Sequence, residues 1–122
     1  MARVLVADDE SAIRDVITST CELDGYEVQS HAVSADAIAG YAAFAPDLMI
    51  LDVNMPGGGA EAILAALEEQ LGHLPCPAIV VSGYADEFLH HACIREIIQK
   101  PFGIDALRIA MKTALSAGGQ SA

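Results

Sequence analysis

Five polar side chains stand where hydrophobic segments of this sequence end. They are Asp8 and Asp9 after residues 3–7, Asp52 after residues 48–51, Ser82 after residues 78–81 and Lys100 after residues 96–99. Several carboxylates close together cannot all stay ionised cheaply without a cation, and Mg²⁺ takes oxygen ligands and bridges to phosphoryl groups. An aspartate can attack phosphorus to give an acyl phosphate, while a metal ion, a lysine and a hydroxyl bind the transferred oxygens. Brought together, these side chains would form a magnesium-dependent phosphoryl-transfer site.

The elements that must position them alternate along the chain. Strands are predicted at residues 3–7, 27–32, 48–51, 78–81 and 96–99. Apolar residues at helical spacing predict helices at residues 11–23, along Ile63, Leu67 and Leu71, and from Ile104 through Leu115. A further helix is expected to begin at an N-cap, Ser34, and to stop before Pro46. Residues 86–92 could form a short helix. This alternation implies a parallel sheet covered on both faces. The carboxyl ends of its strands share one edge, where ligands bind, so the five polar side chains should converge there.

Length and composition predict one α/β domain with an aliphatic core. The chain has 122 residues, of which 53% are hydrophobic and only 5% aromatic. That length suits a single domain, which we expect to span residues 1–117, followed by a flexible tail at 118–122. The apolar runs are too short to span a bilayer, and the N-terminus lacks the apolar core of a signal peptide. We therefore expect a cytoplasmic protein without membrane contact.

Charge and cysteine usage weigh against two other classes of protein. A net charge of −11, with six scattered basic residues, argues against direct binding of nucleic acid. Cys21, Cys76 and Cys93 are widely spaced, which is typical of reduced, buried thiols and not of a disulfide framework or a zinc site. The adjacent His90 and His91 point in different directions on a helix, so we expect solvated surface there.

Four ordered motifs resemble those of bacterial two-component response-regulator receiver domains. They are VLVADDE at 4–10, PDLMILDVNMPG at 46–57, VVSG at 80–83 and KPF at 100–102. The resemblance covers nearly the whole chain. It implies a flavodoxin-like, doubly wound, five-stranded parallel sheet in the order 2-1-3-4-5, with helices on both faces and a fourth helix that is shortened or irregular here.

The resemblance also implies a role for each polar residue. Asp52 would accept the phosphoryl group, and Ser82 and Lys100 would contact its oxygens. Mg²⁺ would be bound by Asp52, by Asp9 directly, by Asp8 mainly through water and by the backbone carbonyl of Asn54. Backbone amides near Met55 and Gly83 would face the phosphoryl oxygens, and the Lys100–Pro101 peptide bond would be cis.

The same resemblance implies a phosphorelay function. A sensor histidine kinase or a phosphotransfer protein would supply the phosphoryl group, and phosphorylation would switch partner interactions, homodimer formation among them. The chain would be no enzyme beyond catalysing its own phosphorylation and dephosphorylation.

The chain departs from the family pattern in two features near its C-terminal half. Only 18 positions separate Ser82 from Lys100 (100 − 82), fewer than receivers usually have, which shortens the fourth helix. Ile97 stands where the family's aromatic switch residue lies. We therefore expect the signal to pass through the shortened fourth helix or its loop. Tyr84 should shade the phosphoryl group and slow self-dephosphorylation.

Other interpretations of these residues stay open. A haloacid-dehalogenase-type phosphohydrolase also uses a strand-end aspartate and Mg²⁺, but it needs a second aspartate where Asn54 stands. A pseudo-receiver that only binds partners is a second alternative, and a flavin-binding role is the weakest. Locally, residues 8–10 could be an acidic helix cap, Asp52 a turn residue, and Gly57 to Gly59 a flexible loop.

Overall fold

A five-stranded parallel sheet forms the centre of the protein. The computed structural model describes residues 1–83 and 91–119. The strands are β1 (Arg3–Ala7), β2 (Glu27–His31), β3 (Leu48–Asp52), β4 (Ala78–Ser82) and β5 (Ile94–Gln99). They lie in the order β2-β1-β3-β4-β5, and every neighbouring pair is parallel. The predicted strand order is therefore confirmed.

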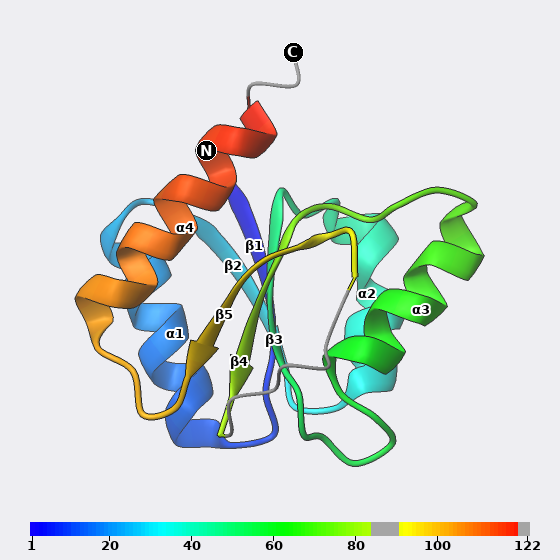
Figure 1. Cartoon of the computed structure of the whole chain (residues 1–122), viewed down its shortest axis with the longest axis horizontal. Coiled ribbons are helices and arrows are strands. Elements are labelled where there is room, and N and C mark those ends of the chain that lie inside the picture. The colour runs from blue at the N-terminus through cyan, green and yellow to red at the C-terminus, as the bar shows by residue number, and fades with distance from the viewer. Residues whose placement is uncertain (84–90, 120–122) are drawn as a thin grey trace.

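Helices cover both faces of this sheet (Figure 1). On one face lie α1 (Ser11–Leu23) and α4 (Ile104–Gly119), and on the other lie α2 (Ser34–Phe44) and α3 (Ala60–Leu71). Each face has its own hydrophobic cluster. Ile17 and Met111 belong to the α1–α4 cluster, whereas Ile63 and Leu67 belong to the α2–α3 cluster. The result is a three-layer α/β domain.

The strand sequences explain why both faces are dry. Successive side chains of a strand point to opposite faces, so a strand buried on both sides must be apolar at every position. All five residues of β3 and of β4 are buried. In β3, Leu48 and Ile50 join the α1–α4 cluster, while Met49 and Leu51 join the opposite one. In β3 and in β4 only the last residue is polar, and it lies at the edge of the sheet where the strand ends.

Most predicted boundaries agree with the structure, and several differ. β5 begins at Ile94 and so is two residues longer than predicted. α4 runs to Gly119, beyond the expected domain end at 117. Ser34 is not the N-cap of α2. Val33 takes that position, and the Ser34 hydroxyl instead donates a hydrogen bond to the carbonyl oxygen of Gly58.

Part of the predicted irregular fourth helix lies outside the described residues. Residues 86–90, which include His90, are not described, and neither is Tyr84. Ala92 stands in a turn before β5. His91, expected to be solvated surface, is instead partly buried: its ring accepts the Cys93 N–H and pairs with Glu68 at 2.9 Å.

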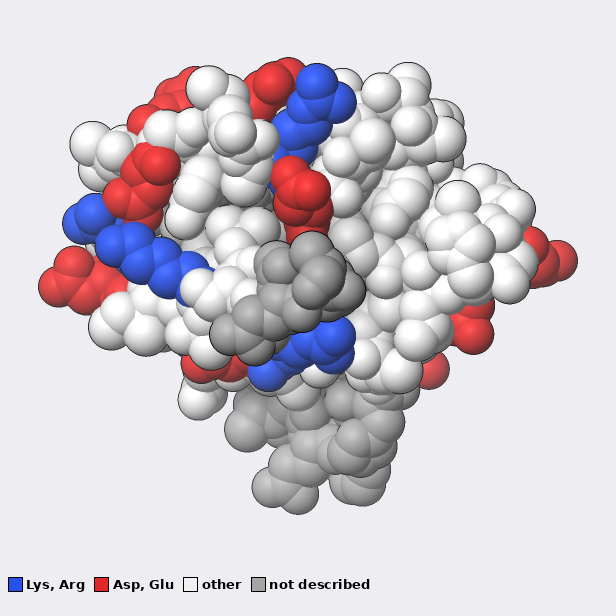
Figure 2. Space-filling view, turned by 90° about the horizontal axis from the view of Figure 1, so that it is seen from above, with Lys and Arg blue, Asp and Glu red and all other residues white. Residues whose placement is uncertain are grey.

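Four further sequence-based expectations can be compared with the structure. All three cysteines are free, with Cys21 and Cys93 buried. The Lys100–Pro101 peptide bond is cis, as predicted. Within the described residues, we find no helix that combines the length and the apolar character needed to cross a bilayer. On the face shown in Figure 2, basic side chains are separated by acidic and uncharged ones.

Candidate functional site

The carboxyl ends of four neighbouring strands bring the predicted site residues to one edge of the sheet. Asp8 follows β1, Asp52 ends β3, Ser82 ends β4 and Lys100 follows β5. Asp52 is in register with Val81, so the ends of β3 and β4 lie side by side. The Lys100 N–H donates to the Ser82 carbonyl oxygen at 2.6 Å, which joins the ends of β4 and β5. Residues up to 92 positions apart (100 − 8) are thereby adjacent.

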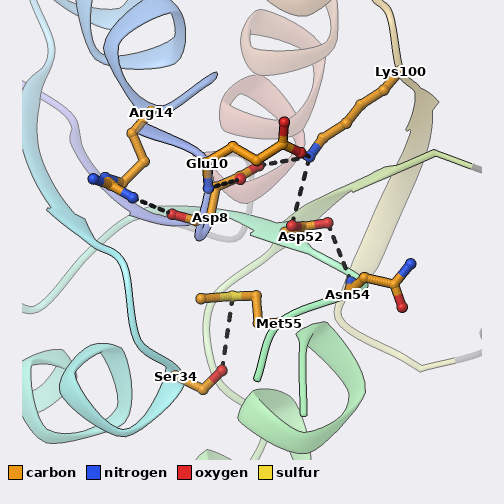
Figure 3. Close-up of polar contacts among 8 residues, drawn as sticks. All are labelled: Asp8, Glu10, Arg14, Ser34, Asp52, Asn54, Met55 and Lys100. Atoms are coloured by element: carbon orange, nitrogen blue, oxygen red, sulfur yellow. Dashed lines mark hydrogen bonds and ion pairs between the residues drawn. The ribbon is translucent and has the colours of Figure 1, made fainter. Parts of the chain in front are cut away.

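The Lys100 ammonium group lies at the centre of this arrangement (Figure 3). Its Nζ is 2.9 Å from Asp8 Oδ2, 3.1 Å from Glu10 Oε1 and 3.5 Å from Asp52 Oδ2. Burial alone would lower the pKa of Lys100, but hydrogen bonds to Asp8 and Glu10 outweigh it and raise the pKa overall. Lys100 therefore stays charged and compensates the acidic groups around it.

Asp8 is almost fully buried, with 1% of its surface exposed. Its Oδ1 accepts the Glu10 N–H at 2.9 Å, and its backbone carbonyl accepts a hydrogen bond from Arg14 Nη1 at 2.8 Å. Its Oδ2 lies 2.9 Å from Lys100 Nζ and has no other hydrogen-bond partner in the part of the chain that the structure describes. A carboxylate oxygen can take more than one partner, so this buried oxygen has room for a cation beside Lys100.

Asp52 is also buried, with 4% of its surface exposed. Its Oδ1 accepts the backbone N–H of Asn54 at 3.2 Å. Burial is the main cause that raises the pKa of Asp52 to about 6, and the negative charge of Asp8 adds to the rise, while the Asn54 hydrogen bond and Lys100 oppose it. The carboxylate is thus charged at neutral pH at a cost in free energy.

That cost predicts a pH-dependent gain in stability for Asp52→Asn in metal-free buffer. The pKa of Asp52 rises from 3.8 to about 6 on folding, so stability falls as the pH increases through this range. The neutral variant should gain about 1–2 kcal/mol above pH 6, with Tm higher by several degrees, and should gain nothing below pH 4. Thermal unfolding at pH 7.5 and at pH 3.5 measures both. Exposed Asp15→Asn makes the same charge change as a control; an equal gain there would contradict this origin.

The acidic side chains could hold a metal ion. Carboxylate oxygens of Asp8, Asp9, Glu10 and Asp52 all lie within 4.8 Å of one another. All are hard oxygen donors, which suit Mg²⁺, and the buried Asp8 Oδ2 has room for one more interaction partner in its hydrogen-bonding shell. The donor set present therefore fits a divalent cation.

The loop between β3 and α3, expected to be flexible from its glycines, comes very close to the end of β3 at Gly59. A Cβ atom on Gly59 would lie 2.0 Å from the Val53 carbonyl oxygen and 2.5 Å from that of Asp52. At Gly58 the backbone has φ +103°, and an added Cβ would lie 2.6 Å from Cβ of Ala62. Gly59 thus lets the loop lie against the backbone of Asp52 and Val53, whereas Gly58 lies against α3.

Two residues of the site were missed by reading the sequence. Glu10 was grouped with Asp8 and Asp9 but was given no role of its own, and it proves to be a direct partner of Lys100. It is the N-cap residue of α1, and its side chain makes no capping hydrogen bond. The sequence patterns assign no role to Arg14, which donates to the Asp8 carbonyl oxygen. Its position one turn into the helix after β1 was the available signal.

Comparison with known families agrees with this arrangement. The family described as the response regulator receiver domain matches residues 4–112. This chain belongs to that family. Members are receiver domains of two-component systems, and the fold, the strand order and the position of the acidic edge now have a common explanation.

Individual relatives support the assignment. The transcriptional regulatory protein KdpE of Mycobacterium tuberculosis is 30% identical over 119 residues, covering 94% of this chain and 51% of KdpE. A CheY-like receiver domain from Methanospirillum hungatei superposes with a TM-score of 0.88 at 26% identity, covering 100% of this chain and 99% of that one. The protein TrrA of Thermotoga maritima, solved with Mg²⁺ and BeF, gives a TM-score of 0.81 at 26% identity, covering 93% and 99%. The receiver chain spans only 23% to 52% of the length of such curated relatives.

Proposed function

We propose that this receiver domain accepts a phosphoryl group on Asp52 in a Mg²⁺-dependent reaction and thereby switches its interactions with partners. A sensor histidine kinase or a phosphotransfer protein is the donor. The observation that carries the proposal is the contact between Asp52 Oδ2 and Lys100 Nζ at 3.5 Å, inside a ring of three further carboxylates. A buried nucleophile beside a fixed cation suits attack on a phosphoryl group.

In this proposal each side chain has one task. An Asp52 carboxylate oxygen attacks phosphorus, the bond from phosphorus to the donor's imidazole nitrogen breaks, and the imidazole leaves with that electron pair. Lys100 pairs with a phosphoryl oxygen, and the Ser82 hydroxyl contacts another. Asp8, Asp9, Asp52 and the Asn54 carbonyl would hold Mg²⁺. When bound, the ion neutralises charge on the carboxylates and the phosphoryl oxygens.

The chemistry of the site favours this proposal over a phosphohydrolase. A phosphohydrolase of the haloacid dehalogenase type needs a general acid two positions after the nucleophile, and Asn54 cannot donate a proton as an acid does. Asn54 is instead used to hold Asp52 through its backbone N–H. The retained carboxylates and Lys100 likewise favour a working receiver over a pseudo-receiver.

Incubation with acetyl phosphate and Mg²⁺ tests the proposal. Intact-mass measurement should show the gain of one phosphoryl group in the wild type and in Asp15→Asn, but none in Asp52→Asn or in the presence of excess chelator. Tryptic mapping should place the group on Asp52. A wild-type protein that stays unmodified under these conditions, and with a histidine phosphotransfer donor, would be a pseudo-receiver. Continuous phosphate release from phosphomonoesters would support the phosphohydrolase.

A further inference from the structure

The Glu10 carboxylate contacts the same ammonium group of Lys100 that would bind the phosphoryl group. The Glu10 backbone is fixed on both sides: its N–H donates to Asp8 Oδ1, and its carbonyl oxygen accepts the Arg14 N–H at the start of α1. A side chain at an N-cap ordinarily accepts hydrogen bonds from its own helix. That of Glu10 makes no such bond and reaches instead to Lys100, 90 positions away in the sequence.

Three carboxylates surround the Lys100 ammonium group. An ammonium group has three N–H bonds and no acceptor, and carboxylate oxygens of Asp8, Glu10 and Asp52 lie within 3.5 Å of Nζ. A phosphoryl oxygen that approaches Lys100 therefore competes with these three carboxylates.

Burial decides which carboxylate leaves most easily. Asp8 and Asp52 are 1% and 4% exposed, so as long as Asp52 is still a free carboxylate, losing the ammonium would leave a buried charge uncompensated at either residue. The Glu10 side chain is 60% exposed and can exchange Lys100 for water at little cost, because exposed ion pairs contribute weakly. Glu10 is also the most exposed of the three carboxylates around Lys100, and its negative charge repels an anionic phosphodonor.

We propose that Glu10 is a displaceable partner of Lys100. Its carboxylate holds the ammonium group within the site before phosphorylation and yields its place to a phosphoryl oxygen on transfer to Asp52. Glu10 is thus a positioning residue that restrains the reaction, and it sets the rate at which the receiver responds to a donor. The inference rests on the proposed function of Asp52.

The chain offers a matched control for this idea. Glu27 is another exposed glutamate in an ion pair, 3.6 Å from Arg3 and 50% exposed, and it lies at the opposite end of the β1–β2 pair. Glu10→Gln and Glu27→Gln each remove one negative charge from an exposed ion pair. Only the first changes the surroundings of Lys100, so the difference between them isolates that contact from net charge.

Two measurements test the proposal, and the first needs neither metal nor phosphoryl group. In metal-free protein, the ¹⁵N resonance of the Lys100 ammonium should shift in Glu10→Gln and stay unchanged in Glu27→Gln. This tests the contact even if Asp52 is never phosphorylated, so failure of the proposed function and failure of this inference are distinguishable. An unshifted Lys100 resonance in Glu10→Gln would show that the contact is absent in solution.

The second measurement is the rate of phosphorylation by acetyl phosphate at saturating Mg²⁺. Glu10→Gln should react about two- to five-fold faster than wild type at low ionic strength, with the gain shrinking as salt is added, and Glu10→Ala should be at least as fast. Glu27→Gln should match wild type. An unchanged or lower rate in both Glu10 variants overturns the proposal, as does a raised Mg²⁺ Kd without a gain in rate, which would make Glu10 an outer metal ligand.

Discussion

Replacing Gly59 by alanine is expected to destabilise the domain by about 3 kcal/mol and to lower its Tm by about 10 °C. The added Cβ would lie 2.0 Å from the carbonyl oxygen of Val53 and 2.4 Å from its carbonyl carbon. Both are backbone atoms, so no side-chain rotation relieves the contact and the chain itself must move. Because the Asp52 carbonyl oxygen is also only 2.5 Å away, the shift reaches Asp52.

Gly103→Ala is the matched control for this prediction. An added Cβ at Gly103 meets nothing within 4 Å, and the backbone there needs no positive φ. The control should therefore unfold within about 0.5 kcal/mol of wild type. Thermal and urea unfolding compare the two variants directly. A Gly59→Ala protein as stable as Gly103→Ala would mean that the loop after β3 yields easily and does not hold Asp52 in place.

Replacing Lys100 by methionine is expected to damage both stability and phosphorylation. Asp8 and Asp52 would keep their buried carboxylates but lose the cation between them, a change that costs about 3 kcal/mol. In metal-free buffer the Tm should therefore fall by about 10 °C. Since a divalent cation supplies positive charge to the same carboxylates, Mg²⁺ should raise the Tm of this variant more than that of wild type.

The rate of Asp52 phosphorylation should fall about 100-fold or more in Lys100→Met at saturating Mg²⁺, because the charge that faces the transferred oxygens is lost. Lys112→Met makes the same substitution at an exposed position of α4 and should leave the Tm and the rate near wild type. Comparable losses in the two variants would indicate a general charge effect in an acidic chain. A stable Lys100→Met protein would show that Asp8 and Asp52 are compensated by something else.

Much of the fold could be predicted because hydrophobic patterns report local geometry and burial. The continuous apolar runs of β3 and β4 require a strand covered on both faces, and the structure buries all their residues. The same runs located the site, since the polar residue that ends each run lies at the carboxyl edge of the sheet. The start of β5 was less predictable: Arg95, Glu96 and Ile97 are exposed on this outermost strand, so burial imposes no clear pattern there.

Details of the site depended on contacts between elements. Ser34 has the residue type of an N-cap, yet its hydroxyl donates a hydrogen bond to the carbonyl oxygen of Gly58, in the loop between β3 and α3. Gly57 to Gly59 have the composition of a flexible loop, yet Gly59 is there because the backbone of Val53 leaves no room for a Cβ atom. In both cases a specific contact within the fold, and not the local propensity, determines the role of the residue.

The sequence by itself determined the class of fold, the order of its elements and the set of residues that meet at the edge of the sheet. Those follow from the periodicity of burial and from the chemistry of five side chains, which any reader of the chain can see. Only the tertiary structure decided how these residues are paired. Glu10 and Lys100 lie 90 positions apart, and their contact depends on strand register and side-chain torsions that no local pattern encodes. For that reason the acidic motif at 8–10 looked uniform in the sequence, whereas in the fold Asp8 is buried and Glu10 is exposed beside the same lysine.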